Sequence, residues 1–329
     1  MTTTEPDTTR DGEPGTHVPR RMRQLSLRTW RGVLVRSVRN FVNDNCSDWA
    51  AALTYYGVLA LFPSAIVVVA LVGLVSDGER TLDTVVDLAN QVGAGSVVTG
   101  DDDNGVVGVI RTVVLDQSNP ELLLSFGLLG ALWSASGFIG AFTRASNAIY
   151  GVTEGRPVWK LRPIQIGLAA VTLVLLAVVA LALIVSGPVT DAVGDLINAG
   201  GLARTVWSVA KWPVLALVMM VLLSLLFWIA PNVRQPRFRW LTPGGAVALV
   251  SWTAVSFGFG LYVATFASYK TTYGSLGAAI AFLVWLYLSN SALMLGVQIN
   301  AEVQRGRQLQ AGDPDPEEPV LPPRKAANS

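Results

Sequence analysis

Hydrophobic residues in this chain gather into long windows without charge instead of alternating with polar residues. Six windows contain no Asp, Glu, Lys or Arg. They cover about residues 49–75, 122–143, 163–186, 212–230, 243–267 and 274–301. A helix needs about 20 consecutive apolar residues to cross a bilayer. The pattern therefore predicts an all-α integral membrane protein with six transmembrane helices.

The polar segments around these windows complete the predicted organisation. Residues 1–20 are rich in Thr, Pro, Gly and charge, and residues 304–329 in Pro and charge, which is typical of disordered tails. Within residues 21–48, apolar positions recur at helical spacing between arginines. This spacing predicts an amphipathic helix at the membrane interface, with a soluble docking helix as the alternative. The six-span membrane domain then covers 49–303, with 76–121 as its long outer loop.

The basic residues predict the orientation of the windows. Nineteen of the 24 Lys and Arg residues lie in the two tails and in the connections after the second and fourth windows. Cytoplasmic segments of membrane proteins carry an excess of Lys and Arg. We therefore expect a multi-pass protein of the cell (plasma) membrane with both termini in the cytoplasm, which an even number of spans allows.

The last window carries more polar side chains than a lipid-facing helix tolerates. Most of them, with Glu302, fall along one face at a pitch of 3.6 residues. Polar groups in hydrocarbon cost several kcal/mol unless they are paired, so this face is expected to meet protein or water. We call the following residues the polar seam, and predict that they line a path or join helices: Tyr287, Asn290, Ser291, Gln298 and Asn300.

Ionisable residues near the span ends form a second candidate site. The predicted topology brings all of them to the cytoplasmic face, as an ion-pair cluster of Asp48, Arg144, Glu154, Arg156 and Glu302. Our hypothesis is that Arg144 pairs with Asp48 or Glu302, because an unpaired charge at that depth is costly. The alternative is that Arg144 extends to the interface without a partner.

The residues that soluble enzymes use are almost absent. His17 is the only histidine and Cys46 the only cysteine, so neither a His/Cys metal cluster nor an intramolecular disulfide can form. No phosphate-binding or dinucleotide-binding glycine motif occurs. The basic residues follow the topology and form no patch. We therefore expect no enzyme, no metal, no cofactor and no nucleic-acid partner.

Several local motifs resemble one known family. They are AALTYYGVLALFP (51–63), NAIYGVTEGRPVWKLR (147–162), and the YGSLGA, WLYLS and INAE pieces of 273–302. With Pro231-Asn232 and Pro243-Gly244, they resemble the YihY/virulence factor BrkB family of bacterial inner-membrane proteins, formerly labelled ribonuclease BN. The resemblance implies six spans with cytoplasmic termini. Relatives more often carry glutamate where this chain has Gln298, so no proton relay is expected here. The ribonuclease label is not expected to apply.

The sequence is compatible with two functions. The first is a transporter or flippase-like permease for an envelope-related or lipid-like substrate, because the polar seam is polar but uncharged. The second is a non-transporting scaffold for envelope assembly or stress resistance, in which the polar seam only joins helices. The lipid bilayer is the predicted partner in both. A lipid or small-molecule cargo and a homo-oligomeric state stay open.

Overall fold

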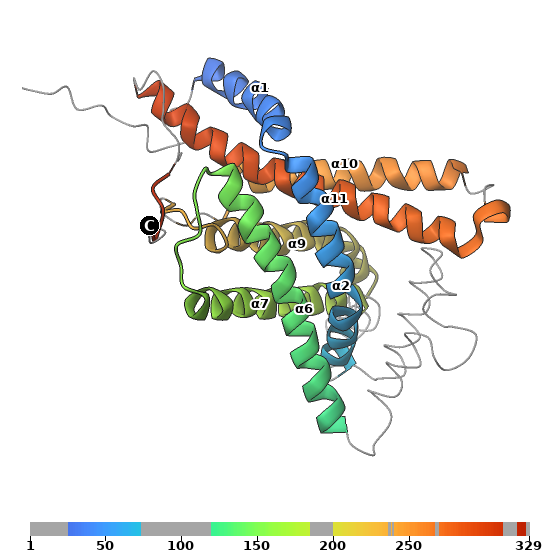
Figure 1. Cartoon of the computed structure of the whole chain (residues 1–329). Coiled ribbons are helices and arrows are strands. Elements are labelled where there is room, and N and C mark those ends of the chain that lie inside the picture. Colours follow the sequence, from blue (N-terminus) through green and yellow to red (C-terminus); the bar gives the residue numbers. More distant parts are fainter. Residues whose placement is uncertain are drawn as a thin grey trace, which may run out of the picture.

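The computed structural model of the chain describes residues 26–73, 120–184, 200–235, 238, 240–266, 270–311 and 321–326. Within these ranges the fold is helical, and the only β-type contact is an isolated bridge between Val233 and Pro323. The helices are α1 (Leu27–Asn43), α2 (Cys46–Gly73), α6 (Pro120–Ile149), α7 (Val158–Ile184), α9 (Gly200–Ile229), α10 (Pro243–Phe266) and α11 (Lys270–Gln310). Figure 1 shows their arrangement. The predicted tail 1–20 and nearly all of the outer loop 76–121 lie outside the described residues.

Nearly all of the described part of each apolar window lies on one long helix. Four helices are long and apolar enough to cross a membrane, with candidate spans at Val158–Ala180, Val209–Ile229, Pro243–Tyr262 and Ala279–Gln310. The windows 49–75 and 122–143 fall on α2 and α6, which have 28 and 30 residues. An all-helical fold with several apolar helices of membrane-crossing length is therefore confirmed.

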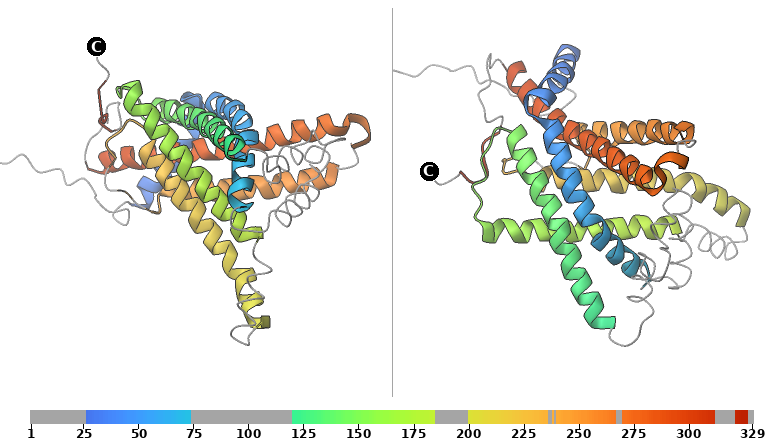
Figure 2. Two further views of the ribbon diagram at one scale, coloured as in Figure 1. Left: turned by 90° about the horizontal axis from the view of Figure 1, so that it is seen from below. Right: turned by 45° about the vertical axis from the view of Figure 1, so that its right-hand side comes forward.

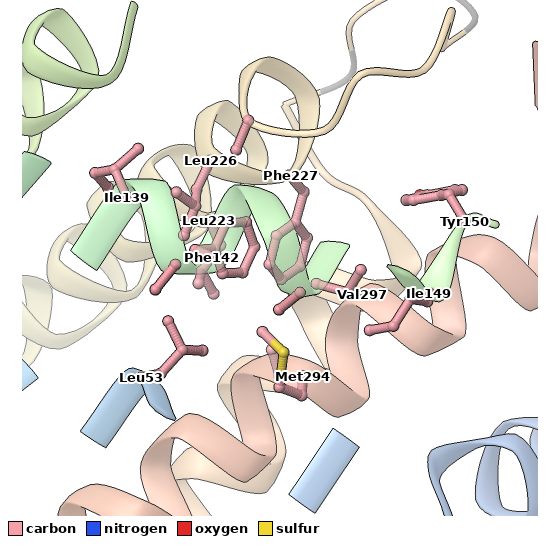
Figure 3. Close-up of a cluster of buried hydrophobic side chains, with 14 of the residues drawn as sticks. Leu53, Ile139, Phe142, Ile149, Tyr150, Leu223, Leu226, Phe227, Met294 and Val297 are labelled. Carbon is pink, nitrogen blue, oxygen red and sulfur yellow. The ribbon is translucent and has the colours of Figure 1, made fainter. Parts of the chain in front are cut away.

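The buried core lies at one end of these helices. It contains the beginnings of α2, α7 and α10 and the ends of α6, α9 and α11. Figure 3 shows its centre, where the rings of Phe142 and Phe227 stack with centroids 5.9 Å apart, beside Leu53 and Met294. Since consecutive long helices reach this core by alternate ends, the chain runs back and forth between two sides.

Away from the core the helices spread apart. Figures 1 and 2 show that the opposite ends of α6, α7 and α10 point in different directions. Large apolar side chains there are exposed, among them Trp133, Phe257 and Leu283. In a soluble protein such exposed apolar surface would be unfavourable, whereas lipid covers it without cost.

Helix α1 packs beside the last turns of α11. Ser26 caps its N-terminus, since the Ser26 Oγ accepts a hydrogen bond of 3.1 Å from the Thr29 backbone N–H. Val33 packs with Ile299 and Val303 of α11. A turn at Asn45, whose φ is 50°, then leads into α2. The predicted amphipathic helix over 21–48 is therefore shorter in the structure, and α2 already begins at Cys46.

The C-terminal region differs from the disordered tail predicted for 304–329. Helix α11 continues to Gln310, and residues 321–326 lie against the connections that follow α6 and α9. The composition of this region suggested disorder because it offers few apolar side chains. Leu321 packs against the core and Gln310 accepts from Thr29, but residues 321–326 are otherwise held by backbone groups and Arg324, which a hydropathy pattern does not register.

Helices α10 and α11 approach closely at two glycines. A Cβ added at Gly244 would collide with the carbonyl oxygen of Gly296, and one added at Gly296 would lie 2.7 Å from the Cβ of Ala248. Small residues at such crossings let helix backbones approach each other. The close contact also lets the Gly244 N–H donate a 2.9 Å hydrogen bond to the side chain of Asn300.

We predict that Gly244→Ala destabilises the protein by about 1–3 kcal/mol, because the new methyl group has no space. Gly258→Ala on the same helix is the matched control, since no atom lies within 4 Å of the Cβ it would add. Thermal unfolding in detergent, followed by size-exclusion chromatography, measures the difference. Equal unfolding temperatures for the two variants would contradict the close packing.

Candidate functional site

The polar seam of α11 faces α2 and the turn before it. Tyr287 Oη lies 2.8 Å from Ser47 Oγ, and the Asn290 side chain donates to Thr54 Oγ1 at 3.2 Å. These bonds join helices that are far apart in sequence. The prediction that this face meets polar groups of the protein therefore agrees with the geometry of Tyr287 and Asn290.

Gln298 is the most deeply buried member of the polar seam, with 1% of its surface exposed. Its Nε2 donates to Asp44 Oδ2 at 3.0 Å, and the thiol of Cys46 donates to its Oε1 at 3.7 Å. An amide has donors and an acceptor, so it can satisfy both partners at once. A neutral amide thus connects α11 to the turn between α1 and α2.

The remaining two residues of the polar seam have other roles. Ser291 Oγ donates to the Tyr287 carbonyl of its own helix at 2.9 Å. Asn300 accepts from the backbone N–H of Gly244 and so lies against the start of α10. The structure therefore brings Tyr287, Asn290 and Gln298 to one interface and does not bring Asn300 there.

Glu302 continues the same interface toward α1. Its carboxylate accepts from Arg36 Nε at 2.7 Å and from the Asn40 side chain at 2.8 Å. The guanidinium of Arg305 lies 3.6 Å from the same carboxylate. The side chain of Glu302 is only 3% exposed. A carboxylate buried to this degree needs such partners, because desolvation of a charge is costly.

A polar cavity of about 220 Å³ opens where these contacts meet. Its lining comes from the end of α1 and the turn after it, the end of α6 and the later turns of α11, namely Asn40, Asn43, Asp44, Ile149, Gln298, Ala301, Glu302 and Arg305. The walls are amides and charges of both signs. Gln298 lies at the boundary between this cavity and the rest of the polar seam.

The predicted ion-pair cluster divides into separate groups. Glu302 pairs with Arg36, as described above, and Glu154 pairs with Arg156 through bonds of 2.8 Å. The guanidinium carbon of Arg144 lies over the ring of Tyr56, 5.7 Å from the ring centroid. Arg144 takes part in none of the ion pairs found among the described residues. The hypothesis that Arg144 pairs with Asp48 or Glu302 therefore does not match the structure, since Arg36 occupies Glu302.

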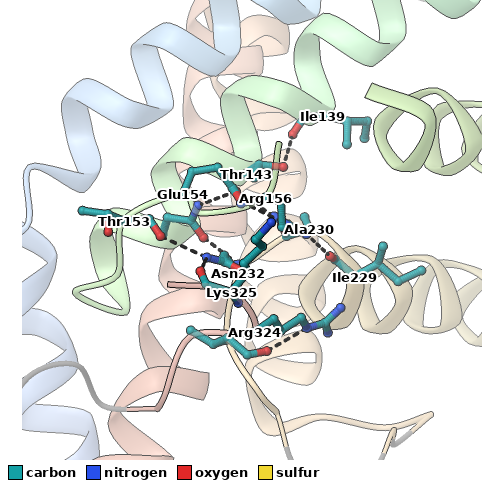
Figure 4. A network of polar contacts seen from close by, with 12 residues as sticks. Ile139, Thr143, Thr153, Glu154, Arg156, Ile229, Ala230, Asn232, Arg324 and Lys325 are labelled. Carbon is teal, nitrogen blue, oxygen red and sulfur yellow. Dashed lines mark hydrogen bonds and ion pairs between the residues drawn. The ribbon is translucent and has the colours of Figure 1, made fainter. Parts of the chain in front are cut away.

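The Glu154–Arg156 pair organises the connections after α6 and α9. Arg156 donates to the carbonyl oxygens of Ala230 at 2.7 Å and Ile229 at 3.4 Å, at the C-terminus of α9. A cation at this end of a helix interacts favourably with its dipole. Asn147 donates to Glu154 and accepts from the Asn232 N–H, so both connections share one network (Figure 4).

Burial and bonding act in opposite directions on Glu154. Burial alone would raise the pKa of its carboxyl group, but hydrogen bonds and charge from Arg156, with a hydrogen bond from Asn147, lower the pKa below its usual value. The carboxylate is therefore held ionised. Its role in the network is structural, because its partners are the side chain and backbone N–H of Arg156 and the side chain of Asn147.

The partners from α1 and the following turn were missed by sequence reasoning. Arg36, Asn40 and Asp44 recur at intervals of four residues, so they share one polar helix face. The amphipathic pattern directed attention to the apolar face of that helix and to its interfacial arginines. The four-residue spacing was the available signal.

The apolar helices of membrane-crossing length and the polar interface between them define a polytopic α-helical membrane protein. A family model described as virulence factor BrkB matches residues 37–320, and the chain belongs to that family. The resemblance noted from the motifs is thereby confirmed.

Individual relatives support this membership. A putative ribonuclease-like protein, YfkH of Bacillus subtilis, is 34% identical over 266 residues, covering 80% of this chain and 92% of YfkH. A UPF0761 membrane protein of Rhodospirillum centenum is 31% identical over 284 residues, and one of Xanthomonas campestris 26% over 297 residues. The chain spans 60% and 62% of these two proteins, and the matches cover 85% and 87% of the chain. No solved structure gave a significant match.

We predict that Glu302→Gln lowers stability by about 1.5–3 kcal/mol, because the amide oxygen that then accepts from Arg36 carries no charge and the partly buried guanidinium loses its ion-pair partner. Asp48→Asn, at an exposed position in the first turn of α2, is the matched control and should lower stability by less than about 1 kcal/mol, the usual limit for an exposed charge at a helix end. Thermal unfolding in detergent provides the comparison. If the control is destabilised as much as Glu302→Gln, the buried pair has no special role.

A pH series tests the Glu154 network. Folding lowers the pKa of Glu154 below its ordinary value of 4.5. The ionised carboxylate therefore stabilises the folded state at pH values above 4.5, and this stabilisation is lost as the pH falls through the lower pKa of the folded state. Wild type should therefore be more stable than Glu154→Gln at pH 7, and the difference should shrink toward pH 4. A difference that grows on acidification would contradict the assignment.

Proposed function

We propose that this protein is a permease of the flippase type, which moves an envelope-related or lipid-like substrate with a small polar head. The observation that carries the proposal is the polar cavity of about 220 Å³ that ends at Gln298. A transport path needs such an opening, because the substrate has to exchange one polar environment for another.

The lining of the cavity indicates the kind of group it would accept. Carboxylates of Asp44 and Glu302 face it together with the guanidinium of Arg305 and the amides of Asn40 and Asn43. Charges of both signs suit a zwitterionic or strongly hydrogen-bonding head group better than a simple ion. At about 30 Å³ for each water molecule, the volume corresponds to roughly seven waters. A head group of that size would leave its apolar part outside the cavity.

The hydrogen bonds of the polar seam close the path beyond the cavity, and the proposed open state replaces their protein partners with water or substrate. Among the described residues, four bonds join the polar seam to α2 and the turn before it, and these bonds involve Tyr287, Asn290 and Gln298. Side-chain hydrogen bonds inside membranes contribute about 0.6 kcal/mol each on average. In the open state, water or the polar head of the substrate would have to replace these partners, because an unpaired amide at this depth costs several kcal/mol.

The same proposal places the protein in the cell membrane with six crossings and both termini in the cytoplasm. The distribution of Lys and Arg supports this orientation, as does the back-and-forth path of the long helices. Helix α1 would lie at the cytoplasmic interface. It exposes Leu34, Val38 and Val42, with Arg31 and Arg39 nearby, which suits a surface of lipid head groups.

We do not propose an enzymatic role. The relative YfkH carries a ribonuclease-like name. The side chains around the polar cavity of this chain are amides, carboxylates and arginine, and Cys46 is buried against Gln298. Purified protein is expected to leave RNA intact under conditions in which it remains folded.

A scaffold for envelope assembly is the second candidate. It is favoured by the hydrogen-bonded state of the polar seam, since Tyr287, Asn290 and Gln298 all have protein partners. A seam that never opens would serve only to join α2 to α11. The two candidates differ in whether water reaches Asn290.

Cysteine labelling separates the two functions. In a Cys46→Ser background, which keeps a hydroxyl donor for Gln298, single cysteines at Asn43, Gln298 and Asn290 would be exposed to a membrane-impermeant thiol reagent. A permease should label quickly at Asn43, and slowly but completely at Gln298 and Asn290, because the closed state opens only in a small fraction of molecules.

Val284→Cys is the matched control, because it lies on the apolar, exposed part of α11 and should stay unlabelled in lipid. Labelling confined to Asn43, with none at Gln298 or Asn290 after long exposure, would contradict the permease and favour the scaffold. Labelling at Val284 would show instead that the protein had lost its lipid environment.

A further inference from the structure

A short C-terminal segment occupies a platform built by two connections of the membrane domain. The segment is residues 321–326, and the platform consists of residues 153–156 after α6 and 228–234 at the end of α9 (Figure 4). The family match ends at residue 320, so the segment follows the part of the chain that the family model covers. Its contacts with the platform are specific enough to treat it as a bound peptide.

The platform recognises the backbone of this segment. The side chain of Asn232 donates to the Lys325 carbonyl at 2.8 Å and accepts from the Lys325 N–H at 3.2 Å. The Arg324 N–H donates to the Asn232 carbonyl at 2.9 Å, and the Arg234 N–H donates to the Pro322 carbonyl at 2.8 Å. These bonds pair two extended segments in antiparallel fashion, as when a peptide adds a strand to a protein.

One side chain adds specificity to the backbone contacts. Arg324 lies over the ring of Trp228, 5.2 Å from its centroid, and donates to the carbonyl oxygens of Val233 at 2.9 Å and Trp228 at 2.5 Å. Burial and the charge of Arg156 lower the pKa of Arg324 below its usual value. Only arginine combines a planar face for the indole ring with several fixed donors for carbonyl groups.

Gly155 shows that the platform is shaped to receive this chain. A Cβ at this position would collide with the carbonyl oxygen of Lys325 and with the backbone of Ala326. The segment therefore rests directly on the Gly155 backbone. A substitution at Gly155 would displace the segment without changing any residue of the segment. Its effect would therefore report on docking and not on the sequence of the segment.

We propose that the platform is a peptide-binding site whose ligand is the chain's own C-terminal segment, Leu-Pro-Pro-Arg-Lys, bound within the same molecule. The site takes an extended basic segment, with Arg324 as the anchor. Because the segment follows α11, its binding ties the end of the helix that carries the polar seam to the connections after α6 and α9. Release of the segment would free that end of α11 from them.

The first experiment uses the full-length protein in lipid nanodiscs. Limited trypsin digestion after Arg324 should be at least tenfold slower in wild type than in Gly155→Ala, since the docked segment is held by backbone and Arg324 hydrogen bonds and has to leave the platform to fit the protease. Gly167→Ala is the matched control, because no atom lies within 4 Å of the Cβ it would add, and it should behave like wild type. Equal cleavage rates in wild type and Gly155→Ala would overturn the proposal.

The second experiment tests whether the site binds a free peptide. A variant that ends at residue 320 would be titrated with a fluorescent peptide of residues 318–329. The truncated protein is expected to bind the peptide saturably. Its affinity for the Arg324→Lys peptide should be at least tenfold weaker. The full-length protein should not bind the peptide, because its own segment fills the site. A truncated, monodisperse protein that does not bind the peptide would overturn the proposal. Protection from trypsin that disappears on dilution would also overturn it, because it would assign the segment to a second copy.

Discussion

The buried amide of Gln298 is the constraint on which the arrangement of α11 depends. A polar side chain at this depth must be paired, because an unsatisfied amide in an apolar environment costs several kcal/mol. Asp44 and Cys46 supply the partners, and both lie beside the turn that joins α1 to α2. The register of α11 against α2 is therefore fixed by hydrogen bonds as well as by the apolar packing around Met294.

The apolar core lies at one side of the helix bundle. The helices converge where α2 begins and α11 ends, and they spread apart at the other side (Figure 2). Most of the internal packing is thus confined to the side that carries the polar cavity, the Arg156 network and the C-terminal segment. Gln298 couples α11 to the start of α2 and the turn before it, and Glu302 couples α11 to α1.

Hydropathy predicted the helices, because long apolar windows have few alternatives in a membrane. Spacing along α11 was enough to predict that Tyr287, Asn290 and Gln298 lie on one polar face, since residues three and four apart share one side of a helix. Asn300 was assigned to the polar seam although it lies only two residues beyond Gln298, and it faces the start of α10 instead of α2. Arg36 was missed as the partner of Glu302, because a pattern within one helix does not reveal which neighbour lies on each side. The docking of Arg324 depends on backbone carbonyls of a distant helix end, which no local pattern in the tail encodes.

The central claim is that the interface between α11 and α2 is a closed state of a path that opens. Single-molecule energy transfer in nanodiscs, between labels at Arg39→Cys on α1 and Trp159→Cys on α7 in a Cys46→Ser background, measures this most directly. We expect a dominant population and a minor second population. Asp44→Ala should enlarge the minor population, because Gln298 then loses its carboxylate partner. One unchanged population in both proteins would contradict the account and leave the polar seam as a fixed contact between helices.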